Sequence, residues 1–158
     1  MAARRSAGIL LFRRAGGALH VLLVHPGGPL WARKDEGVWS IPKGEYEETQ
    51  DPRAAALREF EEELGRPLPT EPDAELIELG AVRQPGGKIV TAWAAEGDLD
   101  ADAIVSNTFE LEWPPRSGTS QSFPEVDSAA WFTVDEARAK ILRGQLPLID
   151  ALLEAIGG

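Results

Sequence analysis

Residues 44–65 read Gly-Glu-Tyr-Glu-Glu-Thr-Gln-Asp-Pro-Arg-Ala-Ala-Ala-Leu-Arg-Glu-Phe-Glu-Glu-Glu-Leu-Gly. Within this stretch Asp51 suits the N-cap of a helix, and Pro52 suits the first helical position, where a missing N–H costs nothing. Gly65 suits the left-handed residue that closes a helix. The stretch therefore predicts one helix with defined ends, from about Asp51 to Gly65.

The predicted helix has an acidic face and an apolar face. Three glutamates spaced by three or four residues share one face: Glu59, Glu62 and Glu63. Three apolar residues share a separate stripe: Leu57, Phe60 and Leu64. Like charges at this spacing repel by about 0.2–0.5 kcal/mol per pair, which a bound cation would offset. A solvated acidic face is the alternative, but carboxylates also suit Mg²⁺ or Mn²⁺.

The residues before the helix favour a binding site over a solvated face. Trp39-Ser40-Ile41-Pro42 is expected to form a short strand, and Lys43-Gly44-Glu45 follows it. Glycine at position 44 allows a sharp turn and brings backbone carbonyl oxygens close to the acidic helix. Strand, turn and helix together predict a cation and phosphate site.

This stretch resembles the signature of the Nudix hydrolases, G-x5-E-x7-R-E-U-x-E-E-x-G-U, where U is a bulky aliphatic residue. The fixed positions that match are Gly44, Arg58, Glu59, Glu62, Glu63 and Gly65, and Phe60 fills the first U. The box spans Gly44 to Arg66, with Gln50 replacing the first Glu and Arg66 replacing the last U. Gln50 has no charge with which to bind a cation strongly. We expect activity to survive, with Glu47 or Glu48 compensating in part.

The resemblance implies a set of metal ligands. Glu59 and Glu63 are expected to bind Mg²⁺ (or Mn²⁺) directly, together with the backbone carbonyl of Lys43. Glu62 is expected to bind a further ion or to polarise water. Arg58 is expected to hold the acidic residues and the loop in place.

A further carboxylate is expected from outside the box. Many Nudix proteins carry a Glu shortly before a strand that contains Trp, where it binds metal or acts as base. In the stretch 123–132 that position is Glu125, with Asp127 as the alternative. The expected catalytic residues are thus Glu62, Glu125 and Arg58. His20 and His25 are expected to be structural.

Length and composition predict one ordinary folded domain over residues 1–158. Apolar residues make up 43% and charged residues 27% of the chain, as in soluble globular proteins. The chain has no cysteine, which excludes disulfides, thiolate metal sites and a cysteine nucleophile. The apolar run Ile9–Phe12 is too short for a signal peptide or a membrane span, so we expect a cytoplasmic protein without membrane contact.

The net charge of −10 argues against binding of long nucleic acids, which depends mainly on phosphate neutralisation. It is compatible with a small phosphate compound, because Mg²⁺ bridges two negative partners. We therefore expect a small nucleotide as the partner. The sequence carries no signal for an oligomeric state.

The remaining pattern predicts strands on both sides of the central helix. Strands are expected at 7–13, 19–25, 75–83, 88–95, 108–113 and 129–132, and further helices at 135–142 and 147–156. Residues 114–122 are expected to be loop because of their proline, glycine and serine content. This order fits an α+β protein. The resemblance sharpens it to the Nudix fold, an α/β/α sandwich around a mixed β-sheet.

The substrate is expected to be a nucleoside diphosphate linked to another group. Residues 82–93 resemble the Lys-x-Val-x-x-Trp strand of asymmetric diadenosine tetraphosphate hydrolases, which makes Lys88 a candidate for the phosphate chain. The other basic candidates are Arg33, Lys34 and Arg83. Three aromatic residues are candidates for stacking on a base: Trp31, Trp113 and Phe123.

Three hypotheses remain open at this point. The first is a Mg²⁺-dependent hydrolase that prefers dinucleoside polyphosphates. The second keeps the chemistry but acts on nucleoside triphosphates, capped or triphosphorylated RNA, or inositol pyrophosphate. The third, suggested by Gln50, is a nucleotide-binding module with impaired catalysis.

Overall fold

The computed structural model describes residues 4–69 and 76–157. Its centre is a hairpin of two apolar strands, β1 (Arg5–Ala15) and β2 (Ala18–Pro26). The two strands are joined at Gly16 and Gly17, which have φ of 59° and 80°. This left-handed backbone favours glycine and lets the chain reverse tightly. The strands predicted at 7–13 and 19–25 are confirmed, and they pair with each other as a hairpin.

A six-stranded mixed sheet forms around this hairpin in the order β4-β5-β1-β2-β8, with β3 paired to β1. The other strands of the sheet are β3 (Lys43–Glu45), β4 (Ile77–Arg83), β5 (Ile89–Glu96) and β8 (Val126–Thr133). The helices are α1 (Pro52–Leu64), α2 (Val134–Lys140) and α3 (Leu146–Ile156), with 3₁₀ turns η1 (Ala101–Ala103) and η2 (Arg143–Gln145). The β1–β5 pair is parallel, and its neighbours in the sheet are antiparallel.

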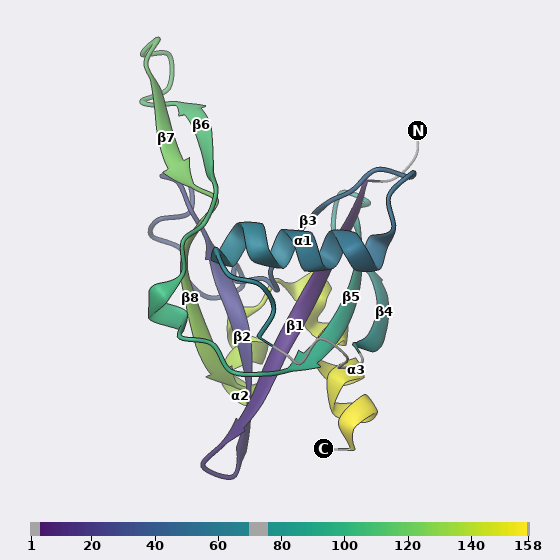
Figure 1. Cartoon of the computed structure of the whole chain (residues 1–158). Coiled ribbons are helices and arrows are strands. Elements are labelled where there is room, and N and C mark those ends of the chain that lie inside the picture. Colours follow the sequence, from purple (N-terminus) through teal and green to yellow (C-terminus); the bar gives the residue numbers. More distant parts are fainter. Residues whose placement is uncertain (1–3, 70–75, 158) are drawn as a thin grey trace.

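Both faces of the sheet are covered by helices (Figure 1). Alternate residues of β1 point to opposite sides: Ile9 and Leu11 join one core cluster, and Leu10 and Phe12 join the other. The first cluster contains the buried face of α1, including Phe60. The second contains the buried residues of α2 and α3. This arrangement confirms the predicted α/β/α sandwich.

Two predictions of local structure are wrong. Trp39–Pro42 is not a regular strand; it makes isolated bridges to Val24 and Ile141, and regular pairing begins at Lys43. Pro42 has no N–H to donate to a ladder. Residues 114–122 are not all loop, since β7 (Ser120–Pro124) pairs with β6 (Thr108–Glu112).

The β6–β7 hairpin forms an arm that projects from the body beyond the C-terminal end of α1 (Figure 1). The serine-rich β7 has low intrinsic strand propensity, but the ladder with β6 supplies its backbone hydrogen bonds. Phe109 and Phe123 face each other across the two strands, with ring centroids 6.1 Å apart. This long-range pairing overrides the local composition, which is why sequence pattern alone missed it.

Helix α1 begins and ends as the sequence predicts. The Asp51 side chain accepts a hydrogen bond from the N–H of Ala54 at 3.1 Å, and Gly65 is left-handed with φ of 75°. We expect Asp51→Ala to lower the free energy of unfolding by about 1 kcal/mol, because it removes the N-cap. Urea denaturation measures the change. Asp51→Asn retains a capping oxygen and should stay close to wild type; an equal loss in both variants would contradict the capping role.

Candidate active site

The segment 40–45 lies between β1 and β2, where the two strands diverge. The β1–β2 ladder covers only 12–15 of β1, while Gly8 pairs with Lys43 and Val24 bridges Ser40. The N–H of Ile9 donates to the carbonyl of Pro42 at 3.1 Å. The sheet therefore fixes the backbone around Lys43 from both sides, immediately beneath the acidic face of α1.

The Glu59 carboxylate lies close against Gly44. A Cβ built on Gly44 would lie 2.0 Å from both Cδ and Oε2 of Glu59. Atoms this close clash, so no other residue fits without displacing Glu59 or the strand. Gly44 sits in β3 and is not among the residues with positive φ. The expectation that it makes a sharp turn is therefore wrong, and the Glu59 carboxylate fills the space that a side chain at position 44 would occupy.

Four glutamates lie close together at this point: three belong to α1, and the fourth, Glu125, immediately precedes β8. Burial raises the pKa of Glu63 to about 8 against the opposing charge of Lys43, and the negative charges of Glu59 and Glu125 add to the increase. Burial also raises the pKa of Glu59, with Glu62 and Glu125 contributing. The pKa of Glu125 is raised by burial and by Glu62. The predicted carboxylates therefore lie close enough for their charges to affect one another's pKa.

Two of the basic residues contact these acids directly. An Nη of Arg58 donates to Oε1 of Glu59 at 3.1 Å, and its Nε lies 3.8 Å from Oε1 of Glu62. The backbone N–H of Lys43 donates to Oε1 of Glu63 at 3.4 Å. Arg58 is thus placed where it can hold two acids in position.

Lys43 and Lys88 bring positive charge to the same region. The pKa of Lys43 is lowered to about 8, first by burial and then by the charge of Lys88, while Glu63 and Glu45 oppose the decrease. Lys88 is partly buried and immediately precedes β5. Two ammonium groups in contact disfavour each other's charge, so an anion between them would be stabilising.

A cavity of about 250 Å³ opens beside these groups. Lys43, Glu63 and Glu125 form its polar side. Its apolar wall includes Val24, Trp31, Val38, Ile41, Val126 and Leu142. The sequence named Trp31 only as one of three stacking candidates. It gave no signal for the aliphatic part of the wall, because those residues come from strands and loops far apart in the chain.

The other basic candidates lie around the cavity or farther out. Arg33 and Lys34 are exposed on the loop that follows β2, and the Lys34 ammonium lies 5.1 Å from the centroid of the Trp31 ring. Arg83 is exposed at the end of β4. Trp113 and Phe123 belong to the β6–β7 arm and are not part of the cavity wall.

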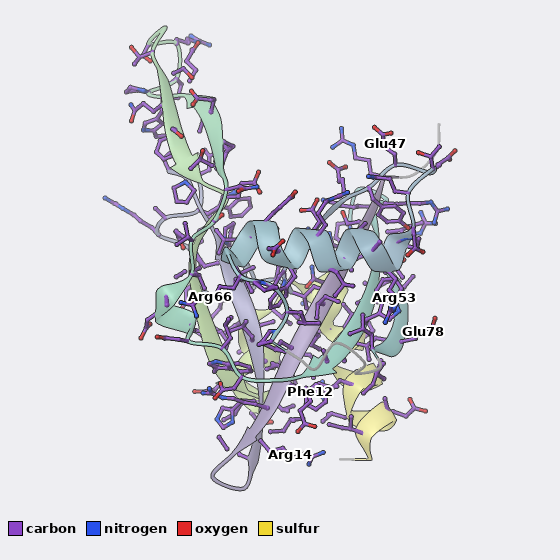
Figure 2. The ribbon with its side chains drawn as sticks, viewed as in Figure 1. Phe12, Arg14, Glu47, Arg53, Arg66 and Glu78 are labelled. Atoms are coloured by element: carbon purple, nitrogen blue, oxygen red, sulfur yellow. The ribbon has the colours of Figure 1, made fainter. Side chains whose placement is uncertain are left out.

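The residues expected to compensate for Gln50 are not near the acids. The amide oxygen of Gln50 accepts from the N–H of Glu47 at 2.9 Å, in an exposed turn. Glu47 and Glu48 line a separate surface hollow with Arg5. Figure 2 shows Glu47 by the N-terminal end of α1, while Arg66 follows the opposite end. Compensation from this loop is therefore wrong for the conformation described.

His25 and Asp127 have structural contacts, as expected for the histidine. The buried ring of His25 has Nδ1 2.8 Å from Oδ1 of Asp127 and Nε2 2.6 Å from the carbonyl oxygen of Lys34. Asp127 is occupied by this contact, which leaves Glu125 as the carboxylate of this segment that faces the cavity. His20 lies beside the carbonyl of Ala18, 3.3 Å away.

Gln145 is a buried residue that sequence reasoning missed. Its amide oxygen accepts from the N–H of Ile41 at 3.1 Å, and its nitrogen donates to Ser40 Oγ at 3.0 Å and to Gln84 at 2.8 Å. It therefore ties the segment before Lys43 to the turn before Lys88. A single glutamine ahead of a helix carries no sequence signal for such a role.

Comparison with known proteins gives three kinds of similarity: to a curated relative, to solved structures and to a family model. A 65-residue part of the chain is 40% identical to an RNA pyrophosphohydrolase of Gluconacetobacter diazotrophicus, covering 39% of this chain and 36% of that protein. The match thus spans about a third of the curated relative.

Solved structures resemble the whole chain at low identity. A C. elegans Ap4A hydrolase matches with a TM-score of 0.64 and 20% identity, covering 99% of each chain. The NUDIX domain of Shewanella oneidensis NrtR, in complex with ADP ribose, matches with a TM-score of 0.65 and 19% identity over 99% of this chain and 90% of that one. At about 20% identity, these matches show that the chain has the same fold as these structures.

The NUDIX domain family model matches residues 2–152. The match covers nearly the whole chain and includes the acidic helix, the Gly44 contact and Glu125. The chain therefore belongs to the NUDIX domain family.

Proposed function

We propose that this Nudix protein is a Mg²⁺- or Mn²⁺-dependent hydrolase that cleaves a pyrophosphate linkage in a nucleoside diphosphate-X substrate, with dinucleoside polyphosphates preferred. One observation carries the proposal. Glu63 and Glu125 line a cavity together with Lys43, the charges of Glu59, Glu62, Glu63 and Glu125 act on one another, and burial raises the pKa of Glu59, Glu63 and Glu125. Burial and mutual repulsion disfavour the ionised form of these carboxylates, and such clusters are typical of a functional site.

The donor set fits a hard divalent cation. Carboxylate oxygens of Glu59, Glu62 and Glu63 and the carbonyl of Lys43 are ligand types that Mg²⁺ and Mn²⁺ prefer. Among the described residues, no three acidic or histidine side chains stand in a ready coordination geometry. We therefore expect rotamer adjustment of the glutamates on binding. The cation would orient the diphosphate and lower the pKa of a bound water.

The protein side chains would then position the reactants and move one proton. A water oxygen attacks phosphorus while the anhydride P–O bond breaks, and the water proton passes to a carboxylate. Glu125 suits this role, because a raised pKa makes it a better proton acceptor near neutral pH. Glu62 is the alternative acceptor. Arg58 would hold Glu59 and Glu62, and Lys43 and Lys88 would bind phosphate oxygens.

The preference for dinucleoside polyphosphates has two supports. Lys88 lies beside Lys43, and this pair of ammonium groups supports a role in binding a phosphate chain. The Ap4A hydrolase of C. elegans has the same fold over the full chain. Arg33 and Lys34, exposed on the loop next to the cavity, could extend this positive surface.

A second substrate class also has a specific observation in its favour. The curated relative with 40% identity over 65 residues is an RNA pyrophosphohydrolase. The 5′ end of an RNA carries the same pyrophosphate linkage next to a single nucleoside, as do nucleoside triphosphates. In either case the partner is a nucleotide.

No helix in the described part of the chain is long and apolar enough to cross a membrane. We expect a cytoplasmic location.

A substrate panel tests this proposal. Purified protein with Mg²⁺ or Mn²⁺ is incubated with dinucleoside polyphosphates, nucleoside triphosphates, 5′-triphosphorylated RNA and inositol pyrophosphate, and the products are separated by anion exchange. We expect turnover of a dinucleoside polyphosphate with the highest kcat/KM. If the well-folded protein hydrolyses none of these substrates, the result would instead support a binding module with impaired catalysis. Gln50→Glu would then be the first substitution to test.

Metal binding should depend on pH more steeply than for ordinary glutamates. The raised pKa of Glu63, about 8, means that the metal-free site holds a proton at neutral pH, which a cation must displace. Apparent affinity should therefore fall as pH decreases, by about tenfold per pH unit below 8 for one displaced proton. Calorimetry at pH 6.5 and 8.5, in buffers with different ionisation enthalpies, measures affinity and proton release. Equal affinity at both pH values would contradict the claim that the cation displaces a proton from the buried Glu63.

A further inference from the structure

We propose that Gln145 is a positioning residue that holds Lys43 and Lys88 side by side, so that one polyphosphate chain binds both ammonium groups. This inference rests on the proposed function, because it concerns how the protein recognises the phosphates of its substrate. Gln145 is fully buried at the end of η2, immediately before α3. It is not part of the cavity wall and would act through the two lysines.

Gln145 fixes the backbone of the segment that leads to Lys43. The N–H of Ile41, a buried residue, donates to the amide oxygen of Gln145 at 3.1 Å. The amide nitrogen of Gln145 donates to Ser40 Oγ at 3.0 Å. Because a backbone N–H only donates, the contact with Ile41 identifies which end of the amide is oxygen. The chain just before Lys43 is therefore held by a side chain from the C-terminal part of the protein.

The same amide also holds the turn that precedes Lys88. The Gln145 nitrogen donates to the side-chain oxygen of Gln84 at 2.8 Å. Gln84 begins this turn, and its own N–H donates to the carbonyl of Lys88 at 2.7 Å. A Cβ built on Gly144 would lie 3.1 Å from Cγ of Gln84, so the backbone of η2 lies directly against the turn. One side chain thus connects the two segments that carry the lysines.

The two lysines belong to different parts of the sheet and need such a connection. Lys43 pairs with Gly8 in the β1–β3 ladder, and Lys88 immediately precedes β5. Their ammonium groups are close enough for the charge of Lys88 to lower the pKa of Lys43. Like charges repel, so the surrounding structure must keep them together. A polyphosphate bound to one of these lysines then meets the other at a high effective concentration.

A neutral amide is well suited to this role. Gln145 uses its oxygen and both hydrogens of its nitrogen in the three contacts, and it adds no charge beside the lysines. A buried network in which every member has a partner is rigid. Gln145 occupies the N-cap position of α3, but in the described structure its side chain does not cap the helix. Helix capping therefore does not account for the residue.

The test measures binding of phosphate groups without hydrolysis. Methylenediphosphonate has two phosphorus groups joined by a P–C–P bridge that water does not cleave, and orthophosphate has one. Each probe is titrated into the protein in the presence of Mg²⁺ and followed by calorimetry. We expect wild type to prefer methylenediphosphonate. Gln145→Met should weaken its binding by about tenfold, a usual result of losing one hydrogen bond to a charged group, and leave orthophosphate affinity unchanged.

Two further variants separate positioning from general stability. In a Gln145→Met, Lys88→Gln double variant, methylenediphosphonate should bind no more weakly than in Lys88→Gln alone, because no second ammonium group is left to position. Ile149→Val is the matched control, since it shortens a buried side chain of α3 that takes no part in these hydrogen bonds. It should lower the melting temperature and leave the preference between the two probes unchanged.

Additive effects of Gln145→Met and Lys88→Gln, or equal weakening of both probes in Gln145→Met, would overturn the positioning role. A wild-type protein that binds methylenediphosphonate no more tightly than orthophosphate would overturn it as well. If Gln145→Met does not fold, Gln84→Ala decides by the same comparison, because it removes one contact at a partly exposed residue. Binding that depends on Gln145 in a protein that hydrolyses no substrate would support this inference and contradict only the hydrolase activity.

Discussion

Glu63→Gln is expected to lower kcat/KM by about 10³-fold, the largest effect of any single substitution in the site. Its carboxylate contacts the N–H of Lys43, lines the cavity and lies next to Glu59 and Glu125. Glutamine keeps the shape but removes the negative charge with which the site would bind a cation and stabilise the reaction. Steady-state kinetics with the best substrate of the panel measures the loss.

The same substitution should not damage the fold. Burial raises the folded-state pKa of Glu63 to about 8, so the metal-free protein loses stability as pH rises from about 4.5 to 8. Glutamine never carries that charge, and Glu63→Gln in EDTA should be at least as stable as wild type at pH 7. Mg²⁺ should raise the melting temperature of wild type but not of the variant.

The matched control is Glu61→Gln, an exposed residue on the same helix. It removes the same charge outside the cluster and should leave kcat/KM within a few-fold of wild type. Equal losses in the two variants, or full activity in Glu63→Gln, would show that Glu63 does not belong to the catalytic centre.

Gly44→Ala is expected to lower kcat/KM by about 10²-fold. The added Cβ would lie 2.0 Å from the Glu59 carboxylate, so either the carboxylate or β3 must shift by an ångström or more. A misplacement of this size in a catalytic group costs on the order of 10²-fold. The loss should appear in kcat and in the Mg²⁺ concentration needed for half-maximal activity, because Glu59 is an expected metal ligand.

Gly16→Ala is the control for the general effect of adding a methyl group to glycine. Gly16 has a left-handed backbone, and nothing lies within 4 Å of a Cβ built there, at the turn between β1 and β2. This variant should be about 1 kcal/mol less stable than wild type. Its activity should equal that of wild type. A Gly44→Ala enzyme with wild-type metal dependence would mean that Glu59 has no part in metal binding.

The parts of the structure that sequence could predict are those defined by local rules. The N-cap at Asp51, the left-handed Gly65 and the buried stripe with Phe60 follow from side-chain chemistry and helical spacing, and all are present. The gathering of the glutamates on one face follows from the same spacing. The grouping with Glu125, by contrast, came from family resemblance, because no local rule relates residues so far apart.

What sequence could not predict depends on pairing between distant segments. The parallel register of β1 with β5, the β7 strand and the contacts of Gln145 arise only after the chain is folded. The role of Gly44 was misjudged for the same reason. The sequence pattern suggested a turn at Gly44, whereas in the structure this residue lies in β3 against the carboxylate of Glu59.

The position of the 40–45 segment between β1 and β2 has a consequence for the order of folding. This segment can take its final position only after the β1–β2 hairpin has formed. Lys88 reaches the site only when β1 pairs with β5, and these two strands are separated by more than seventy residues of chain. Contacts between such distant residues form slowly, because long loops must close first. The catalytic centre should therefore be among the last parts of the molecule to mature, and recovery of activity on refolding should coincide with completion of the whole sheet.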